Sequence, residues 1–217
     1  MARVISGLRA ERVRANLERV RSDIARAGGD PHEVQILAAV KYVPVEELGV
    51  LAEGGIELLG ENRAQDLALK ADAYPGLFTW DFIGHLQSRK VRQVLPYVRY
   101  IESVAGDSVL TQLARHASSE TEVLVEVNIA REPGKSGIAP SELPAFLERC
   151  PVTVVGLMTM PPAVTDPEAS RPHFAALRKL AQHHGLAHLS MGTSQDYVVA
   201  AQEGATIVRL GTTLYAS

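Results

Sequence analysis

Short apolar runs alternate with longer amphipathic segments along nearly the whole chain. Short runs rich in Val, Ile and Leu are typical of buried strands, whereas longer segments with apolar residues three and four positions apart favour helices. The predicted strands are 34–40, 56–62, 80–87, 100–104, 121–130, 152–160, 188–192 and 206–211. The predicted helices are 7–27, 44–55, 63–74, 88–97, 106–118, 141–150, 167–185 and 193–204.

Strict alternation of strands and helices indicates a parallel sheet, because parallel neighbours need crossover helices. After the first helix the pattern gives about eight strand–helix units without a low-complexity linker, and a barrel closes at eight units. We therefore expect an α/β fold, a single (β/α)8 TIM-type barrel with an extra N-terminal helix, as one domain over 1–217. An open, doubly wound sheet is the competing architecture.

The composition is that of an ordinary globular protein, with 217 residues, 46% of them hydrophobic and 22% charged. The formal net charge of −3 offers no basic field for a nucleic-acid backbone. No apolar run approaches the roughly 20 residues of a membrane span, and the first residues do not resemble a signal peptide. A single cysteine fits a reducing compartment, so we expect a cytoplasmic protein without a cysteine-built metal site.

In such a barrel the chemistry gathers where the strands end. The run "LAAVK" places Lys41 at the end of the first strand. A lysine there either extends into water or serves as a Schiff-base amine, for which desolvation would favour the neutral, nucleophilic form. Other polar residues near strand ends, such as Glu102, Ser103 and Gln87, are explained by the general polarity of loop borders.

Two segments near the end of the chain are typical of phosphate binding. "SMGTSQDYVVAAQEG" (190–204) offers hydroxyls and free N–H groups where a helix begins, although plain helix capping explains part of it. "VRLGTT" (208–213) adds a glycine and more hydroxyls. The first and eighth strands of a closed barrel are neighbours, so one ligand with an aldehyde and a phosphate could bridge them. Pyridoxal 5′-phosphate (PLP) and a phosphorylated sugar aldehyde both qualify.

Several motifs then identify a family. The sequence resembles the pyridoxal phosphate homeostasis protein family over nearly its full length. The resemblance is carried by "AAVKYVPVEEL" (38–48), "LLGENRAQDLALK" (58–70), "WDFIGHLQSRKVR" (80–92), "VEVNIAREPGKSGI" (125–138), "GLMTMPP" (156–162) and "SMGTSQDYVVAAQEGATIVRLGTTLY" (190–215). It implies a lone barrel related to the N-terminal domain of alanine racemase, without that enzyme's second domain. The final "GTTLYAS" departs from the family's usual Gly-Thr-Ala-Ile-Phe-Gly close.

The resemblance also implies roles for particular residues, position by position. Lys41 matches the residue that holds PLP as a Schiff base, and Arg209 matches the one that faces the pyridine nitrogen. The residues implied around the phosphate are Ser190, Gly192, Thr193, Ser194, Gly211 and Thr212. Asn62 and His85 match polar residues at the mouth near the ring. No residue is implied to bind a metal.

The implied function is to carry, buffer or regulate PLP, without an established enzyme activity. A guanidinium only donates hydrogen bonds, so Arg209 would leave the ring nitrogen unprotonated and the ring a poorer electron sink. The expected partners are the cofactor and PLP-dependent apo-enzymes as recipients, with no nucleic acid and no membrane, and we expect a monomer. A low-activity amino-acid racemase or decarboxylase, a Schiff-base aldolase acting on a phosphorylated sugar, and a protein-binding regulator remain alternatives.

Overall fold

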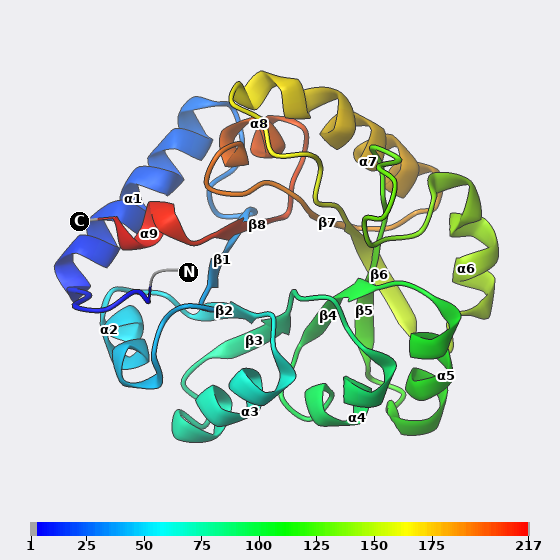
Figure 1. Cartoon of the computed structure of the whole chain (residues 1–217). Helices are drawn as coiled ribbons and strands as arrows, with labels where there is room; N and C mark the ends of the chain where they lie inside the picture. Colours follow the sequence, from blue (N-terminus) through cyan, green and yellow to red (C-terminus); the bar gives the residue numbers. More distant parts are fainter. Residues whose placement is uncertain (1–3, 217) are drawn as a thin grey trace.

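A parallel barrel forms the centre of the molecule in the computed structural model, which describes residues 4–216 (Figure 1). Within these residues eight strands close in chain order, each beside the next and the last beside the first. The strands are β1 (Gln35–Ala39), β2 (Leu58–Glu61), β3 (Thr79–Phe82), β4 (Tyr100–Val104), β5 (Glu122–Glu126), β6 (Thr153–Met158), β7 (His188–Ser190) and β8 (Ile207–Leu210). The predicted barrel is confirmed, and the alternative of an open sheet is wrong.

Helices surround the barrel on the outside (Figure 1). The α-helices are α1 (Ala10–Arg26), α2 (Leu48–Glu53), α3 (Ala64–Ala73), α4 (Val91–Val94), α5 (Asp107–His116), α6 (Leu143–Arg149), α7 (Arg171–His183), α8 (Tyr197–Gln202) and α9 (Thr212–Tyr215). Short 3-10 turns precede four of them, η1 (Val45–Glu47), η2 (Ser88–Lys90), η3 (Pro140–Glu142) and η4 (Pro167–Ser170). The predicted extra N-terminal helix is α1. None of the helices in the described part of the chain is long and apolar enough to span a bilayer.

The pairing of β1 with β8 closes the barrel. It sets the strand that leads to Lys41 beside the strand that carries Arg209. Leu37 lies opposite Arg209, and Ala38 lies opposite Leu210. A small cluster of buried hydrophobic side chains packs inside the barrel, namely Leu37, Tyr100, Leu124, Met158 and Ile207. Because side chains alternate along a strand, Leu37 and Ala39 share the inward face, and the position of Lys41 continues it.

The predicted strand 80–87 is too long, because β3 ends at Phe82. A Cβ on Gly84 would lie 2.2 Å from the backbone oxygen of Asn62. The chain therefore passes very close to the end of β2 at this point, which a strand at normal spacing would not allow. His85 consequently lies on a loop at the barrel mouth rather than in a strand.

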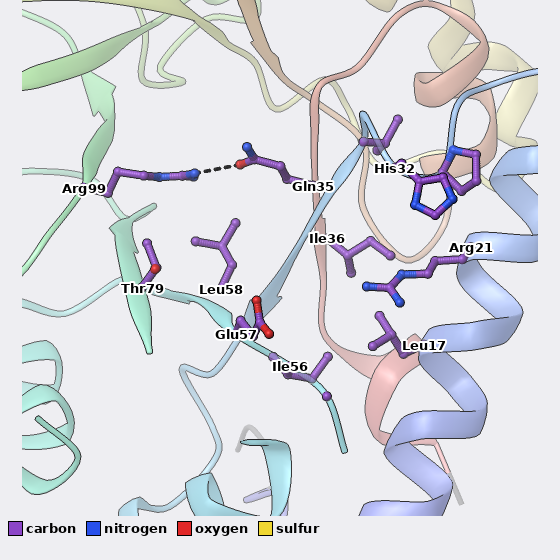
Figure 2. A pocket seen from close by; sticks show the side chains of 13 residues that line it. Leu17, Arg21, His32, Gln35, Ile36, Ile56, Glu57, Leu58, Thr79 and Arg99 are labelled. Carbon is purple, nitrogen blue, oxygen red and sulfur yellow. Dashed lines mark hydrogen bonds between the residues drawn. The ribbon is translucent and has the colours of Figure 1, made fainter. Parts of the chain in front are cut away.

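The opposite end of the barrel, where the strands begin, carries a cavity of about 430 Å³ (Figure 2). Arg21 of α1 projects into it from one side and Arg99, just before β4, from the other. The Arg99 guanidinium donates to Gln35 across the strand ends, at 2.8 Å. It also forms a 2.6 Å ion pair with the buried Asp81 of β3.

Candidate functional site

Lys41 is exposed at the mouth of the barrel, two residues after β1. Its Nζ atom lies 5.0 Å from the centre of the Tyr42 ring. An amine in this position is open to a ligand aldehyde from outside.

A buried ion pair fixes the backbone directly beneath Lys41. Lys70, from α3, donates to the carbonyl of Val40 and to Oε2 of Glu61, both at 2.6 Å. Both side chains are buried, with 6% exposure for Lys70 and none for Glu61. The other oxygen of Glu61 accepts from the backbone N–H of Asn62 and of Arg63. The pair therefore joins the ends of β1 and β2 to α3.

Arg209 is buried inside the barrel near its mouth. Its Nη1 donates to Oγ of Ser190, and its Nη2 donates to the carbonyl of Thr159 at 2.9 Å. Burial lowers the pKa of Arg209, while the nearby charges of Glu102, Glu126 and Asp196 act in the opposite direction. The result is a fixed, buried hydrogen-bond donor on the strand next to Lys41.

The two predicted phosphate segments meet in space. Oγ of Ser194 accepts from the backbone N–H of Gly211 and of Thr213, both at 3.3 Å. A Cβ on Gly211 would be in ordinary van der Waals contact with the carbonyl oxygen of Ala39, at 3.8 Å, so this backbone lies beside the end of β1. Thr212 is exposed at the start of α9.

Gly192 and Thr193 shape the first of these segments. Gly192 has a φ of +92°, and a Cβ there would lie 2.5 Å from the Cβ of Ala200. The backbone N–H and the hydroxyl of Thr193 both donate to Oδ1 of Asp196, at 2.8 and 3.1 Å. These contacts hold the segment in a local turn, and Asp196, the residue before α8, makes no side-chain capping bond to that helix.

Ser190 lies deeper than the other predicted phosphate residues. Its side chain is fully buried, and its hydroxyl donates to Oε2 of Glu102 at 2.6 Å while accepting from Arg209. The structure therefore uses this hydroxyl to connect β7 with β4 and β8 inside the barrel. The backbone that follows Ser190 leads to the mouth.

Asn62 and His85 lie on neighbouring segments of the mouth and together line a cavity of about 210 Å³. Oδ1 of Asn62 is buried and has no hydrogen-bond partner among the described residues. His85 is exposed and also lines a second cavity of about 440 Å³, together with Glu126, Asn128 and Lys135. An unpartnered acceptor and an imidazole thus face space that a polar ring could fill.

These observations allow a test of whether the residues fit PLP. Two backbone N–H groups converge on one oxygen atom, that of Ser194, in the arrangement that a phosphate oxygen also needs. An accessible amine, a buried guanidinium and an orphaned amide oxygen come from strands or strand ends that border the same mouth. These donors and this acceptor fit an aldehyde, an aromatic nitrogen base and a phosphate in one ligand.

The sequence interpretation missed the acidic residues inside the barrel. Glu102 was explained as a polar loop border, and this is wrong, because its side chain is fully buried in the middle of β4. Burial and the charge of Asp81 raise the pKa of Glu102 to about 8. Burial likewise raises the pKa of Glu126, whose carboxylate accepts from Ser136. The sequence signal for the burial of Glu102 was its spacing from Tyr100. Side chains alternate along a strand, so these two residues of β4 share one face.

Comparison with known proteins places the chain among close relatives, although no family model matches it. It is 38% identical to the pyridoxal phosphate homeostasis protein of Aquifex aeolicus, covering 94% of this chain and 96% of that one. It is 33% identical to the protein of that name from Pseudomonas aeruginosa, covering 95% and 94%.

Comparison with solved structures also finds proteins similar to this chain. An unknown protein from Bifidobacterium adolescentis is 30% identical, with a TM-score of 0.85 and 98% of both chains covered. PipY of Synechococcus elongatus, with PLP bound, is 27% identical, with a TM-score of 0.79 and 94% of this chain and 100% of that one covered. Alanine racemase from Corynebacterium glutamicum is only 14% identical, and its TM-score of 0.74 over 96% of this chain and 61% of the racemase shows a shared fold.

Proposed function

The chain belongs to the pyridoxal phosphate homeostasis protein family, and on this premise we propose that it binds PLP and carries, buffers or regulates this cofactor. The observation that carries the proposal is the juxtaposition of β1 and β8. One strand leads to an exposed amine, and the other leads to backbone donors that converge on a single oxygen atom. PLP has an aldehyde and a phosphate to match them.

In the proposed complex Lys41 holds PLP as a Schiff base. The phosphate lies at the segments 192–194 and 211–212, where Ser194 turns its hydroxyl toward the ligand or gives way to it. Asn62 and His85 border the ring, and the free amide oxygen of Asn62 accepts a hydrogen bond from a protonated group of the ligand. Ser190 acts from below by orienting Arg209.

Arg209 determines what the bound cofactor can do. The cofactor supplies an aldehyde for the amine and a ring that can accept electron density. A guanidinium facing the ring nitrogen offers only N–H donors, so this nitrogen stays unprotonated and accepts electron density less readily. Arg209 thereby favours holding the cofactor over turning over amino acids on it.

The exposure of Lys41 supports a role in loading and release. Water and free amines can reach this position without movement of the chain, so the covalent bond can exchange. We propose that the recipients are PLP-dependent apo-enzymes of the cytoplasm and that the protein acts as a monomer.

The proposal is tested by adding PLP to ligand-free protein and recording the visible spectrum. Schiff-base formation should give absorbance near about 420 nm, and Lys41→Ala should abolish it. Lys179→Ala is the matched control, because Lys179 is exposed on α7, away from the mouth. Loaded protein should then restore an apo-enzyme faster than the same amount of free PLP. Wild-type protein that stays colourless with added PLP would refute the proposal.

A further inference from the structure

A file of polar side chains runs through the barrel core from one end to the other. At the bottom, Arg99 pairs with Asp81 through two contacts of 2.6 and 3.1 Å. At the top, Arg209 donates to Ser190, which donates to Glu102 at 2.6 Å. Glu102 lies between the two ends, and the charge of Asp81 acts on it. Few barrel interiors hold such a file, because bulky apolar layers usually fill them.

The two carboxyl groups of this file, those of Asp81 and Glu102, lie at unequal distances from a cation. Asp81 has the guanidinium of Arg99 in direct contact, whereas the nearest cation to Glu102 is Arg209, at 3.9 Å. Oε1 of Glu102 is buried and has no hydrogen-bond partner among the described residues. A buried carboxylate with one good hydrogen bond and a neighbouring carboxylate is poorly stabilised as an anion. Burial and the charge of Asp81 raise the pKa of Glu102 to about 8, and burial raises the pKa of Asp81 as well, while the contact of Asp81 with Arg99 acts in the opposite direction.

We propose that Glu102 is a positioning residue that keeps a proton inside the barrel at neutral pH, so that Arg209 meets the ligand as a cation whose charge Glu102 does not cancel. The inference rests on the proposed function, because it concerns the ligand that Arg209 faces. The proton on Glu102 occupies the orphaned oxygen, and the other oxygen keeps accepting from Ser190. When Glu102 loses this proton to solvent, its charge pairs with Arg209 through Ser190 and weakens the field at the ring nitrogen.

Other titratable and charged groups surround this pair. Asp81 on β3, Arg99 before β4, Glu126 on β5 and Asp196 before α8 act on the pair itself. Tyr100 on β4, Glu122 on β5 and His188 on β7 lie around Arg99 and Asp81. Asp196 is held by Ser170 and Thr193, and Glu126 by Ser136, so both carboxylates have partners of their own. Glu102 alone among these acids is joined to Arg209 through a hydrogen-bonded side chain in the described structure.

The position of the proton is tested first on ligand-free protein. Carbon-13 NMR of labelled glutamate side chains, assigned to Glu102 through the backbone, should show this carboxyl titrating near about pH 8, far above the usual value. A Glu102 carboxyl that titrates below about pH 6 would overturn the inference. This measurement needs only the wild-type chain and does not depend on PLP.

The effect on the ligand is tested with PLP-loaded protein between about pH 6 and pH 10. The wild-type visible spectrum should change with an inflection near that of Glu102, and Glu102→Gln, which imitates the protonated acid, should keep the low-pH spectrum throughout. Glu120→Gln is the matched control, because Glu120 is exposed before β5. An inflection that persists unchanged in Glu102→Gln would overturn the inference and leave the proposed function standing. Wild-type protein that takes up no PLP would refute the proposed function and, with it, the effect of Glu102 on the ligand.

Discussion

Replacing Lys70 with methionine removes the cation that pairs with the buried carboxylate of Glu61 at 2.6 Å. Methionine is one heavy atom shorter than lysine and keeps an unbranched apolar chain, so packing is disturbed little. Breaking a buried ion pair by removing one partner costs about 3–5 kcal/mol, because the remaining charge is left without compensation. Glu61 keeps two backbone donors, from Asn62 and Arg63, so we expect the low end, about 3 kcal/mol.

The assay is urea unfolding of Lys70→Met beside wild type, followed by circular dichroism. If the same variant is unfolded by heat, a loss of about 3 kcal/mol in a protein of this size corresponds to a fall in Tm of about 6–12 °C. Lys179→Met is the control, since it makes the same chemical change on an exposed face of α7. Adding Glu61→Gln to Lys70→Met should recover part of the loss, because the unpaired charge disappears.

The reasoning would be refuted if Lys70→Met unfolded within about 0.5 kcal/mol of the Lys179→Met control, the range typical of surface substitutions. Lys70 also holds the carbonyl of Val40, one residue before Lys41. A variant that still folds should therefore bind PLP more weakly than wild type, as measured by absorbance titration.

Three further predictions concern stability and the ligand. The folded barrel keeps the proton of Glu102 to about pH 8, whereas the unfolded chain loses it near pH 4.5. The free energy of unfolding should therefore fall between these pH values, by on the order of 5 kcal/mol at most. Urea unfolding of Glu102→Gln should show a flatter dependence of this free energy on pH, and a slope equal to that of wild type would contradict the prediction. Gly192→Ala, which places a Cβ against Ala200 at positive φ, should lower stability by about 2 kcal/mol or more in thermal unfolding, whereas Gly76→Ala, with a similar φ but open space, should cost less. Arg209→Glu should alter the visible spectrum of bound PLP and increase exchange of the α-hydrogen of added amino acids for deuterium by NMR, and an unchanged spectrum would count against contact between Arg209 and the ring.

The barrel could be predicted from sequence because its signal is spread over the whole chain. Each buried strand is an apolar run in the sequence, and each helix is an amphipathic segment. Only a few fold topologies are compatible with their alternation. The prediction is most accurate where turn signals bound a run, as at β4, and least accurate at β3. There an apolar run continues past the strand, and only the contact of Gly84 with Asn62 shows why the strand ends.

The residues at the strand ends could be placed on one mouth from topology, but the depth of each side chain could not. In sequence Glu102 looks like a loop-border residue and Ser190 like part of a phosphate-binding segment, and only closure of the barrel reveals that their side chains meet inside it. The pairing of Lys70 with Glu61 likewise depends on how α3 packs over β2. The position of Lys70 three residues after the buried Leu67 was the available signal that it faces inward.

The proposed bond between Lys41 and PLP has a direct chemical test. Loaded protein is treated with borohydride, which reduces a Schiff base to a stable amine, and is then digested and mapped by mass spectrometry. We predict that the pyridoxyl phosphate group is found on the peptide containing Lys41. A group found only on Lys70 or Lys135, or on no lysine of a protein that has taken up PLP, would contradict the proposed site.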